Sequence, residues 1–200
     1  MTAVGPARSR LLPVLALRDV CLFPGASLAA TLDRPAALSA AQMAERSDGH
    51  LLTLSLRDAA SGSRDLHSVG TMAHVRSIQA GSAHGHRVEL DGVARARAET
   101  LVGVDLLIAE AVAIEEGDEG DEWGPAVEAL ARYLHAHVEL RAFLEQRRRS
   151  AEPMSWVNLA CQHLPIAGSA RQKLLESNAP ERCLRISRGL DALLRKEQTT

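Results

Sequence analysis

The hydrophobic pattern in the first half of the chain predicts a β-rich region. From Leu11 to about Ile114, apolar residues occur in short runs separated by glycine, proline and polar residues, which is typical of strands. Pro35 is followed by good helix formers as far as Arg46 and predicts a single helix among them. The predicted strands cover residues 11–17, 27–32, 51–56, 69–79, 87–99 and 105–114. Six short strands with one helix between them favour a closed, barrel-like sheet.

Two of these strands carry residues that bear on function. In the strand at 69–79 both faces mix apolar and polar residues, so Met72 is a candidate for an apolar contact surface. In the strand at 87–99, Gly92 indicates a bulge or bend. Arg95 and Arg97 lie on one face of that strand, which we interpret as a solvated face, with an anion-binding strip as the alternative.

The second half of the chain has a helical period. Val127, Leu130, Leu134 and Val138 predict one helix from Pro125 to about Arg148. Three more helices are predicted: one with Met154, Val157, Cys161 and Leu164, a short one capped by Ser169, and one starting at Asn178 with Leu184, Ile186, Leu190, Leu193 and Leu194 as its apolar set. Together these patterns predict a disordered tail (1–10), a β-rich lobe (11–114), an acidic linker (115–124) and a helical lobe (125–197).

The acidic linker contains the run EEGDEGDE at 115–122, in which six of eight residues are acidic. Such a run is usually a solvated connector, and a docking tail for a basic partner is the alternative.

Composition narrows the functional classes. A net charge of −2 and 2% aromatic residues argue against a nucleic-acid surface and against membrane attraction. The three cysteines are widely spaced and form no C-x-x-C pair. This pattern fits reduced thiols in the cytoplasm better than a disulfide framework or a zinc site. The apolar run after Arg8 and Arg10 is too short and too broken for a signal peptide or a membrane span.

Catalytic and metal-binding patterns are weak. Neither Lys173 nor Lys196 follows a glycine, so the chain has no phosphate-binding loop of the Gly-Lys-Ser/Thr type. Two histidine positions, His135 and His137, diverge on a helix and cannot share one metal ion. Cys161 is interpreted as a small core residue. We therefore expect no catalytic residues, no cofactor and no metal.

Four segments together resemble the substrate-recognition domain at the N-terminus of Lon proteases. These are LPVLALRDVCLFPG (12–25), VGTMAHV (69–75), VELDGVARAR (88–97) and WVNLACQHLPIAGSARQKLLESNAPERCLRI (156–186), in the family's order over nearly the whole chain. The resemblance implies an α+β fold with a PUA-like β-barrel lobe followed by an α-helical bundle. It also implies a role in holding unfolded or tagged polypeptides, without the ATPase and serine–lysine protease that follow this domain in Lon proteases.

The resemblance leaves three functions open. The first is a non-catalytic module that binds unfolded or hydrophobic polypeptide segments through apolar surface on the β lobe where it meets the helices, or through an exposed sheet edge. For this function the candidate residues are Phe23, Pro24 and Met72, although ordinary core packing also explains them. The second is an RNA-binding PUA-like protein, for which Arg95 and Arg97 are the candidates. The third is a regulator that docks on a separate Lon or another protein through the helical lobe.

Overall fold

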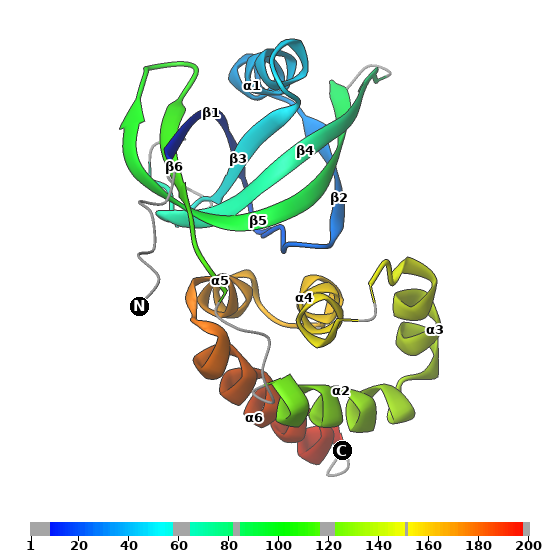
Figure 1. The fold of residues 1–200 in the computed structure, drawn as a ribbon. Coiled ribbons are helices and arrows are strands. Elements are labelled where there is room, and N and C mark those ends of the chain that lie inside the picture. Colours follow the sequence, from blue (N-terminus) through cyan, green and yellow to red (C-terminus); the bar gives the residue numbers. More distant parts are fainter. Residues whose placement is uncertain (1–8, 58–64, 82–84, 117–122, 151, 198–200) are drawn as a thin grey trace. The chain divides into compact units, whose positions relative to one another are not determined.

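The structure, a computed structural model, describes residues 9–57, 65–81, 85–116, 123–150 and 152–197 (Figure 1). The chain divides into two compact units, Met1–Glu115 and Glu116–Thr200, which are described separately. Most of the predicted tail and most of the acidic run lie outside the described residues. Ser9 and Arg10, which were predicted to belong to the tail, form the beginning of the first strand.

In its described residues, the first unit is built on one mixed sheet of six strands with a single helix. Its elements are β1 (Ser9–Leu17), β2 (Ser27–Leu32), α1 (Pro35–Arg46), β3 (His50–Ser55), β4 (Val69–Ala80), β5 (His86–Val102) and β6 (Ile108–Ala113). The strand order is β2-β5-β4-β3-β1-β6, and β5 also pairs with β6 (Figure 1). Five strands therefore form a closed ring, and among the strands that the structure describes, β2 pairs with β5 alone.

The sheet is not a regular barrel. β1 and β3 run parallel, whereas every other pair is antiparallel. β5 is long enough to pair with three neighbours, and register shifts interrupt its pairing with β4 and with β6. In one shift, Met72 lies opposite Ala94 and Ala73 lies opposite Gly92, so Val93 has no partner on β4. This irregularity beside Gly92 confirms the prediction from the sequence. The fold is thus mixed α+β, as predicted.

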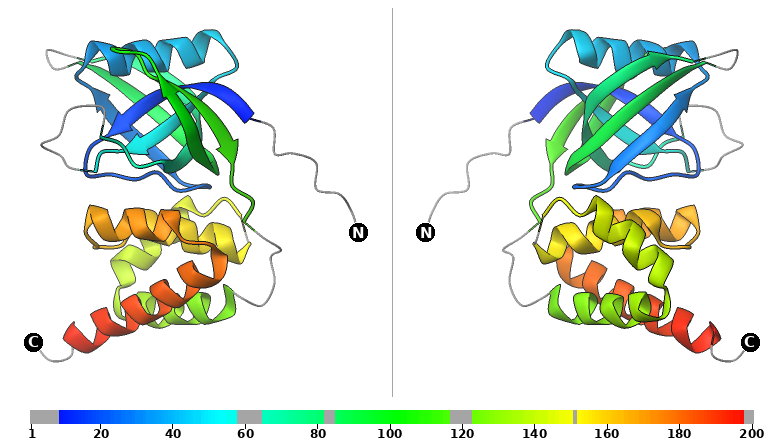
Figure 2. Two further views of the ribbon diagram at one scale, coloured as in Figure 1. Left: turned by 90° about the vertical axis from the view of Figure 1, so that its left-hand side faces the viewer. Right: turned by 90° about the vertical axis from the view of Figure 1, so that its right-hand side faces the viewer.

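Apolar side chains fill the interior of the closed sheet. The cluster combines large residues with small alanines, which allow neighbouring strands to curve closely around it. Its buried members are Leu12, Val14, Leu52, Leu54, Leu56, Leu66, Met72, Ala96, Ala109 and Ala111. Helix α1 contacts β1, β2, β3 and β4 and lies across one end of the sheet (Figure 2). It buries its alanine face, Ala40, Ala41 and Ala44.

Several hydrogen bonds hold the loop between β1 and β2 against the sheet. The Thr71 hydroxyl donates to the Leu22 carbonyl at 2.5 Å, and the Ser55 hydroxyl donates to the Val20 carbonyl at 3.0 Å. The Gly25 amide donates to the Gly92 carbonyl at 2.9 Å. Three of the segments singled out in the sequence therefore meet at this loop: 12–25, 69–75 and 88–97. The residues by which these segments resemble the Lon domain thus have a structural explanation.

Two glycines in those segments allow backbones to approach closely. A Cβ atom at Gly92 would lie 2.2 Å from the Phe23 carbonyl oxygen, and one at Gly70 would lie 1.9 Å from the Thr53 carbonyl oxygen. Real Cβ atoms do not occupy such positions, because backbone atoms cannot move aside as a flexible side chain can. Both positions require glycine for the sheet and the loop to pack as they do.

Five helices make up the described part of the second unit. They are α2 (Gly124–Ala136), α3 (Val138–Arg147), α4 (Pro153–His163), α5 (Gly168–Glu176) and α6 (Ala179–Glu197). The single helix predicted from Pro125 to Arg148 is wrong, because the chain breaks at His137, whose φ and ψ are −120° and 69°. The His137 ring stacks on Tyr133, with 4.0 Å between ring centroids. That contact fixes the corner between α2 and α3.

Of the two predicted helix caps, one is wrong and one is confirmed. Ser169 lies inside α5 rather than at its N-cap, and that helix has no side-chain cap. Asn178 caps α6 as predicted, since its Oδ1 accepts a hydrogen bond from the Glu181 amide at 3.0 Å. Among the residues that the structure describes, no helix is both long enough and apolar enough to cross a membrane.

The buried stripe of α6 differs from the predicted one. Leu184 is 49% exposed, whereas Arg182 is 0% exposed and shares the buried side of the helix with Ala179, Cys183, Ile186 and Leu190. These positions follow i, i+3, i+4, i+7 and i+11 spacing. The periodicity was therefore present in the sequence, but an arginine occupies one of the core positions.

Candidate functional site

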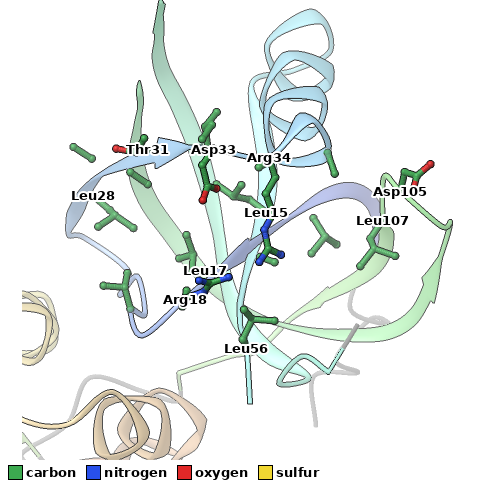
Figure 3. Close-up of a pocket in the computed structure, with 18 residues that line it drawn as sticks. Leu15, Leu17, Arg18, Leu28, Thr31, Asp33, Arg34, Leu56, Asp105 and Leu107 are labelled. Atoms are coloured by element: carbon green, nitrogen blue, oxygen red, sulfur yellow. The ribbon is translucent and has the colours of Figure 1, made fainter. Parts of the chain in front are cut away.

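A pocket of about 310 Å³ opens in the first unit between β1, β2 and the beginning of α1 (Figure 3). Its lining is mostly aliphatic. Its largest aliphatic side chains are those of Leu15, Leu17, Leu28, Leu32, Leu56 and Leu107. Four of these leucines are buried, and Leu28 and Leu107 are half-buried, so the pocket gives access to the margin of the core. We call this the strand-edge groove, because two strand edges border it.

The first border is the outer edge of β2. The Gly92 amide donates to the Ala26 carbonyl, so Ala26 and Gly92 form a hydrogen-bonded pair of the antiparallel ladder. Such pairs alternate along a ladder, so Leu28, Ala30 and Leu32 also direct their backbone groups toward β5. Ala29 and Thr31 therefore direct their N–H and C=O groups toward the opposite edge. No strand pairs with that edge among the described residues.

The second border is the C-terminal half of β1. Leu17 faces β3, because its carbonyl accepts a hydrogen bond from the Leu56 amide at 2.9 Å. Alternation then directs the backbone of Ala16 to the other edge, where the Val14 amide donates to the Leu107 carbonyl at 2.8 Å. β6 pairs with β1 only from Ser9 to Pro13. Beyond Val14, this edge of β1 faces the groove without a strand partner in the described part of the chain.

Charged side chains stand at the margin of the strand-edge groove. Figure 3 shows Arg18 reaching into the pocket from the end of β1 and Arg34 reaching into it from the beginning of α1. Asp33 and Asp105 are the acidic residues of the lining. Both signs are present, so the groove has an apolar floor and a mixed polar margin rather than a strongly charged wall. This combination suits a ligand with a polar backbone and apolar side chains.

The three residues predicted to contact substrate lie elsewhere. Phe23 is 0% exposed, Pro24 is also buried, and Met72 is 9% exposed within the cluster inside the sheet. In this conformation they present little surface to a ligand, which agrees with the core-packing alternative. Their role in substrate binding stays a prediction, and the structure brings none of them to the strand-edge groove.

The two candidate anion-binding arginines are not equivalent. Arg95 is 2% exposed and Arg97 is exposed. The expectation that both stand on a solvated strand face is therefore wrong for Arg95. Register shifts interrupt the pairing of β5 with β4 and with β6, so two residues that are two positions apart on this strand need not be equally exposed. Anion binding by the pair stays a prediction.

Two chemically reactive side chains of the second unit, Cys161 and His163, pack within the helices. Burial raises the pKa of the Cys161 thiol to about 12, so it stays protonated at neutral pH. Burial, with Arg147 and Arg171 nearby, lowers the pKa of His163, which packs edge-on against Phe143. Among the described residues, no three histidine, cysteine or acidic side chains are placed to hold a metal ion.

Sequence reasoning missed the strand-edge groove because it depends on which strand edges remain unpaired. The pattern at 11–17 and 27–32 predicted both strands but not their partners. The available signal was weak: Ser27–Leu32 is a short strand, and short strands are typical of sheet edges.

Comparison with known proteins agrees with the resemblance found in the sequence. Residues 11–192 match the family model described as the ATP-dependent protease La (LON) substrate-binding domain. The Lon protease of Phenylobacterium zucineum is 28% identical over 172 residues, covering 78% of this chain and 21% of that protein. Lon protease 1 of Sorangium cellulosum is 32% identical over 197 residues, covering 88% of this chain and 23% of that protein.

Solved structures give the same fold. The N-terminal domain of the Mycobacterium avium complex Lon protease has a TM-score of 0.76 at 20% identity, covering 91% of this chain and 98% of that one. The Lon N-terminal domain protein from Xanthomonas campestris has a TM-score of 0.61 at 20% identity, covering 88% and 95%. The chain spans about a fifth of the length of the curated relatives that it matches, and the match is to the substrate-binding domain rather than to the ATPase or protease domains. The chain belongs to the family of the Lon substrate-binding domain.

Proposed function

We propose that the first unit binds extended, apolar segments of other polypeptides in the strand-edge groove and that it performs no chemistry on them. The observation that carries this proposal is the pairing of an apolar floor with two strand edges that have no strand partner in the described structure. Membership in a family of substrate-binding domains supports polypeptide recognition in general. The groove adds a place and a binding mode.

In this mechanism the bound segment lies beside β2 as an additional strand. The outward N–H and C=O groups of Ala29 and Thr31 pair with its backbone, while its alternate side chains reach the leucines of the floor. Backbone pairing is independent of side-chain identity, and apolar burial contributes about 25 cal/mol per Å². Recognition is therefore tolerant of sequence and favours segments that a folded protein would hide.

We further propose that the chain serves proteolysis by holding substrates and that it does so in the cytoplasm. This role needs neither a cofactor nor a metal. We also propose that the first unit is a PUA-like barrel and that the helices form a separate bundle. This fold is supported by the closed ring of strands and by the likeness to solved Lon N-terminal domains.

Binding is tested by fluorescence anisotropy with two labelled probes, a reduced unfolded polypeptide and a structured RNA. We expect saturable binding of the polypeptide with weak dependence on salt, because apolar contacts and backbone hydrogen bonds dominate. RNA is expected not to bind. Binding of RNA alone, with the steep salt dependence typical of phosphate contacts, would favour the nucleic-acid function instead. Binding of neither probe would favour docking on a dedicated partner such as a separate Lon.

The groove itself is tested with Ala29→Pro. Proline removes the N–H that faces the groove but no ladder bond to β5, so the sheet is expected to fold normally. We expect the affinity for the unfolded polypeptide to fall about tenfold, because roughly one to two hydrogen bonds and the alignment of the added strand are lost. The matched control, Ala29→Thr, keeps the N–H and should bind like the parent. Equal affinities for the proline and threonine variants would contradict strand addition at β2.

A further inference from the structure

A second pocket lies in the helical unit, between α5 and α6, and has a volume of about 450 Å³. Its apolar lining consists of Leu164, Ile166, Ala170, Leu174, Ile186, Leu190 and Leu193. Most of these side chains are buried or half-buried at the base of the pocket, and both walls are helices. We call this the helix groove. It shares no residue with the strand-edge groove.

The charged residues that line the helix groove are all basic. Lys173 projects from α5, and Arg185 and Arg188 project from α6, and all three are exposed. Arg185 is paired with Glu181 at 2.7 Å. No ion pair within the described residues involves Lys173 or Arg188. An apolar floor with a cationic margin is complementary to a ligand that has an apolar face bordered by acidic residues.

The backbone of α6 is accessible in the same place. Gly189 lines the helix groove in the interior of α6, where glycine is less favourable to a helix than alanine. A Cβ atom at this position would meet no atom within 4 Å, so internal packing does not explain the glycine. The missing side chain lets a ligand approach the helix more closely than any other residue would allow.

We propose that the helix groove docks an acidic amphipathic helix of a partner protein. A helix in such a groove places apolar side chains at i, i+3 or i+4, and i+7 on the floor. Glutamate or aspartate beside those positions then faces Lys173 and Arg188, and the helix crosses α6 at Gly189. The interaction is directed at a folded or folding helix and is separate from the capture of extended segments in the first unit.

The test uses a labelled helical peptide with leucines at i, i+3, i+4 and i+7 and flanking glutamates, and a second peptide with glutamine in place of glutamate. We expect the full chain to bind the acidic peptide about tenfold more tightly than the neutral one, with an affinity that falls as salt rises. The double variant Lys173→Glu/Arg188→Glu should remove most of that preference. Gly189→Phe, which fills the groove, should weaken both peptides.

The matched control is Arg195→Glu/Lys196→Glu, which makes the same change in charge on α6 outside the groove. It should leave the affinity for the acidic peptide within about twofold of the parent. The groove variants should still bind the unfolded polypeptide, so this result is independent of the strand-edge groove. The proposal would be overturned if no peptide bound saturably or if the acidic peptide were not preferred. It would also be overturned if Lys173→Glu/Arg188→Glu and Arg195→Glu/Lys196→Glu lost equal affinity.

Discussion

Replacing Arg182 by methionine is expected to lower the free energy of unfolding of the helical unit by about 3–5 kcal/mol. The side chain is 0% exposed, and its guanidinium contacts include three hydrogen bonds and one ion pair. Its nitrogens donate to the carbonyls of Leu174 and Ser177, both at 3.0 Å, and to Asn158 Oδ1 at 3.1 Å. It also pairs with Glu116 at 3.2 Å. Methionine keeps the volume but leaves these buried acceptors without their donor.

The measurement is urea denaturation followed by the helical circular dichroism signal. Arg185→Met is the matched control, because Arg185 lies on the same helix but forms an exposed i,i+4 pair with Glu181. That change is expected to cost about 0.3–0.5 kcal/mol. Arg182→Lys should fall between the two, since an ammonium group cannot reproduce the planar fork of donors. Similar midpoints for the two methionine variants would show that the buried arginine does not organise this unit.

Gly92→Ala is expected to destabilise the first unit by about 2–4 kcal/mol, because a Cβ atom would overlap backbone rather than side chain. The added atom would stand 2.2 Å from the Phe23 carbonyl oxygen and 2.9 Å from its carbonyl carbon. Relief requires the loop between β1 and β2 to move away from β5, which breaks the bond from the Gly25 amide to the Gly92 carbonyl. Thermal unfolding and near-ultraviolet circular dichroism of the variant measure the effect.

Gly189→Ala serves as the opposite control. Its Cβ atom would meet nothing within 4 Å, and the position lies inside α6. Alanine should therefore stabilise the helix by about 0.5–1 kcal/mol. A Gly92→Ala variant as stable as the parent would mean that the loop adjusts without loss and that the close approach is incidental.

The strands were predictable because each is a short apolar run that ends at a turn residue. The predicted boundaries at 27–32 agree with β2 as observed, and those at 69–79 differ from β4 by one residue. Each signal is local, since Pro24-Gly25 or a polar loop interrupts the run. Pairing is not local. The parallel contact of β1 with β3 and the attachment of β2 to β5 alone cannot be read from these runs, and they create the strand-edge groove.

The helical half shows where apolar spacing fails as a guide. The spacing continues from Leu134 to Val138 and predicts one helix, but Val138 is 70% exposed after the break at His137. No glycine or proline marks that break, which depends on the packing of His137 against Tyr133. Arg182 was missed for a related reason. A prediction based on hydrophobicity assigns arginine to the surface, whereas its hydrogen-bond partners come from α4 and from the end of α5.

The most direct test of the central claim is backbone hydrogen exchange, followed by NMR, with and without the reduced unfolded polypeptide. The amides of Ala16, Ala29 and Thr31 face the strand-edge groove without a ladder partner, so they should exchange rapidly in the free protein. Strand addition predicts that the polypeptide slows exchange at Ala29 and Thr31. Saturable binding that leaves those two amides unchanged, with protection elsewhere in the first unit, would contradict the claim.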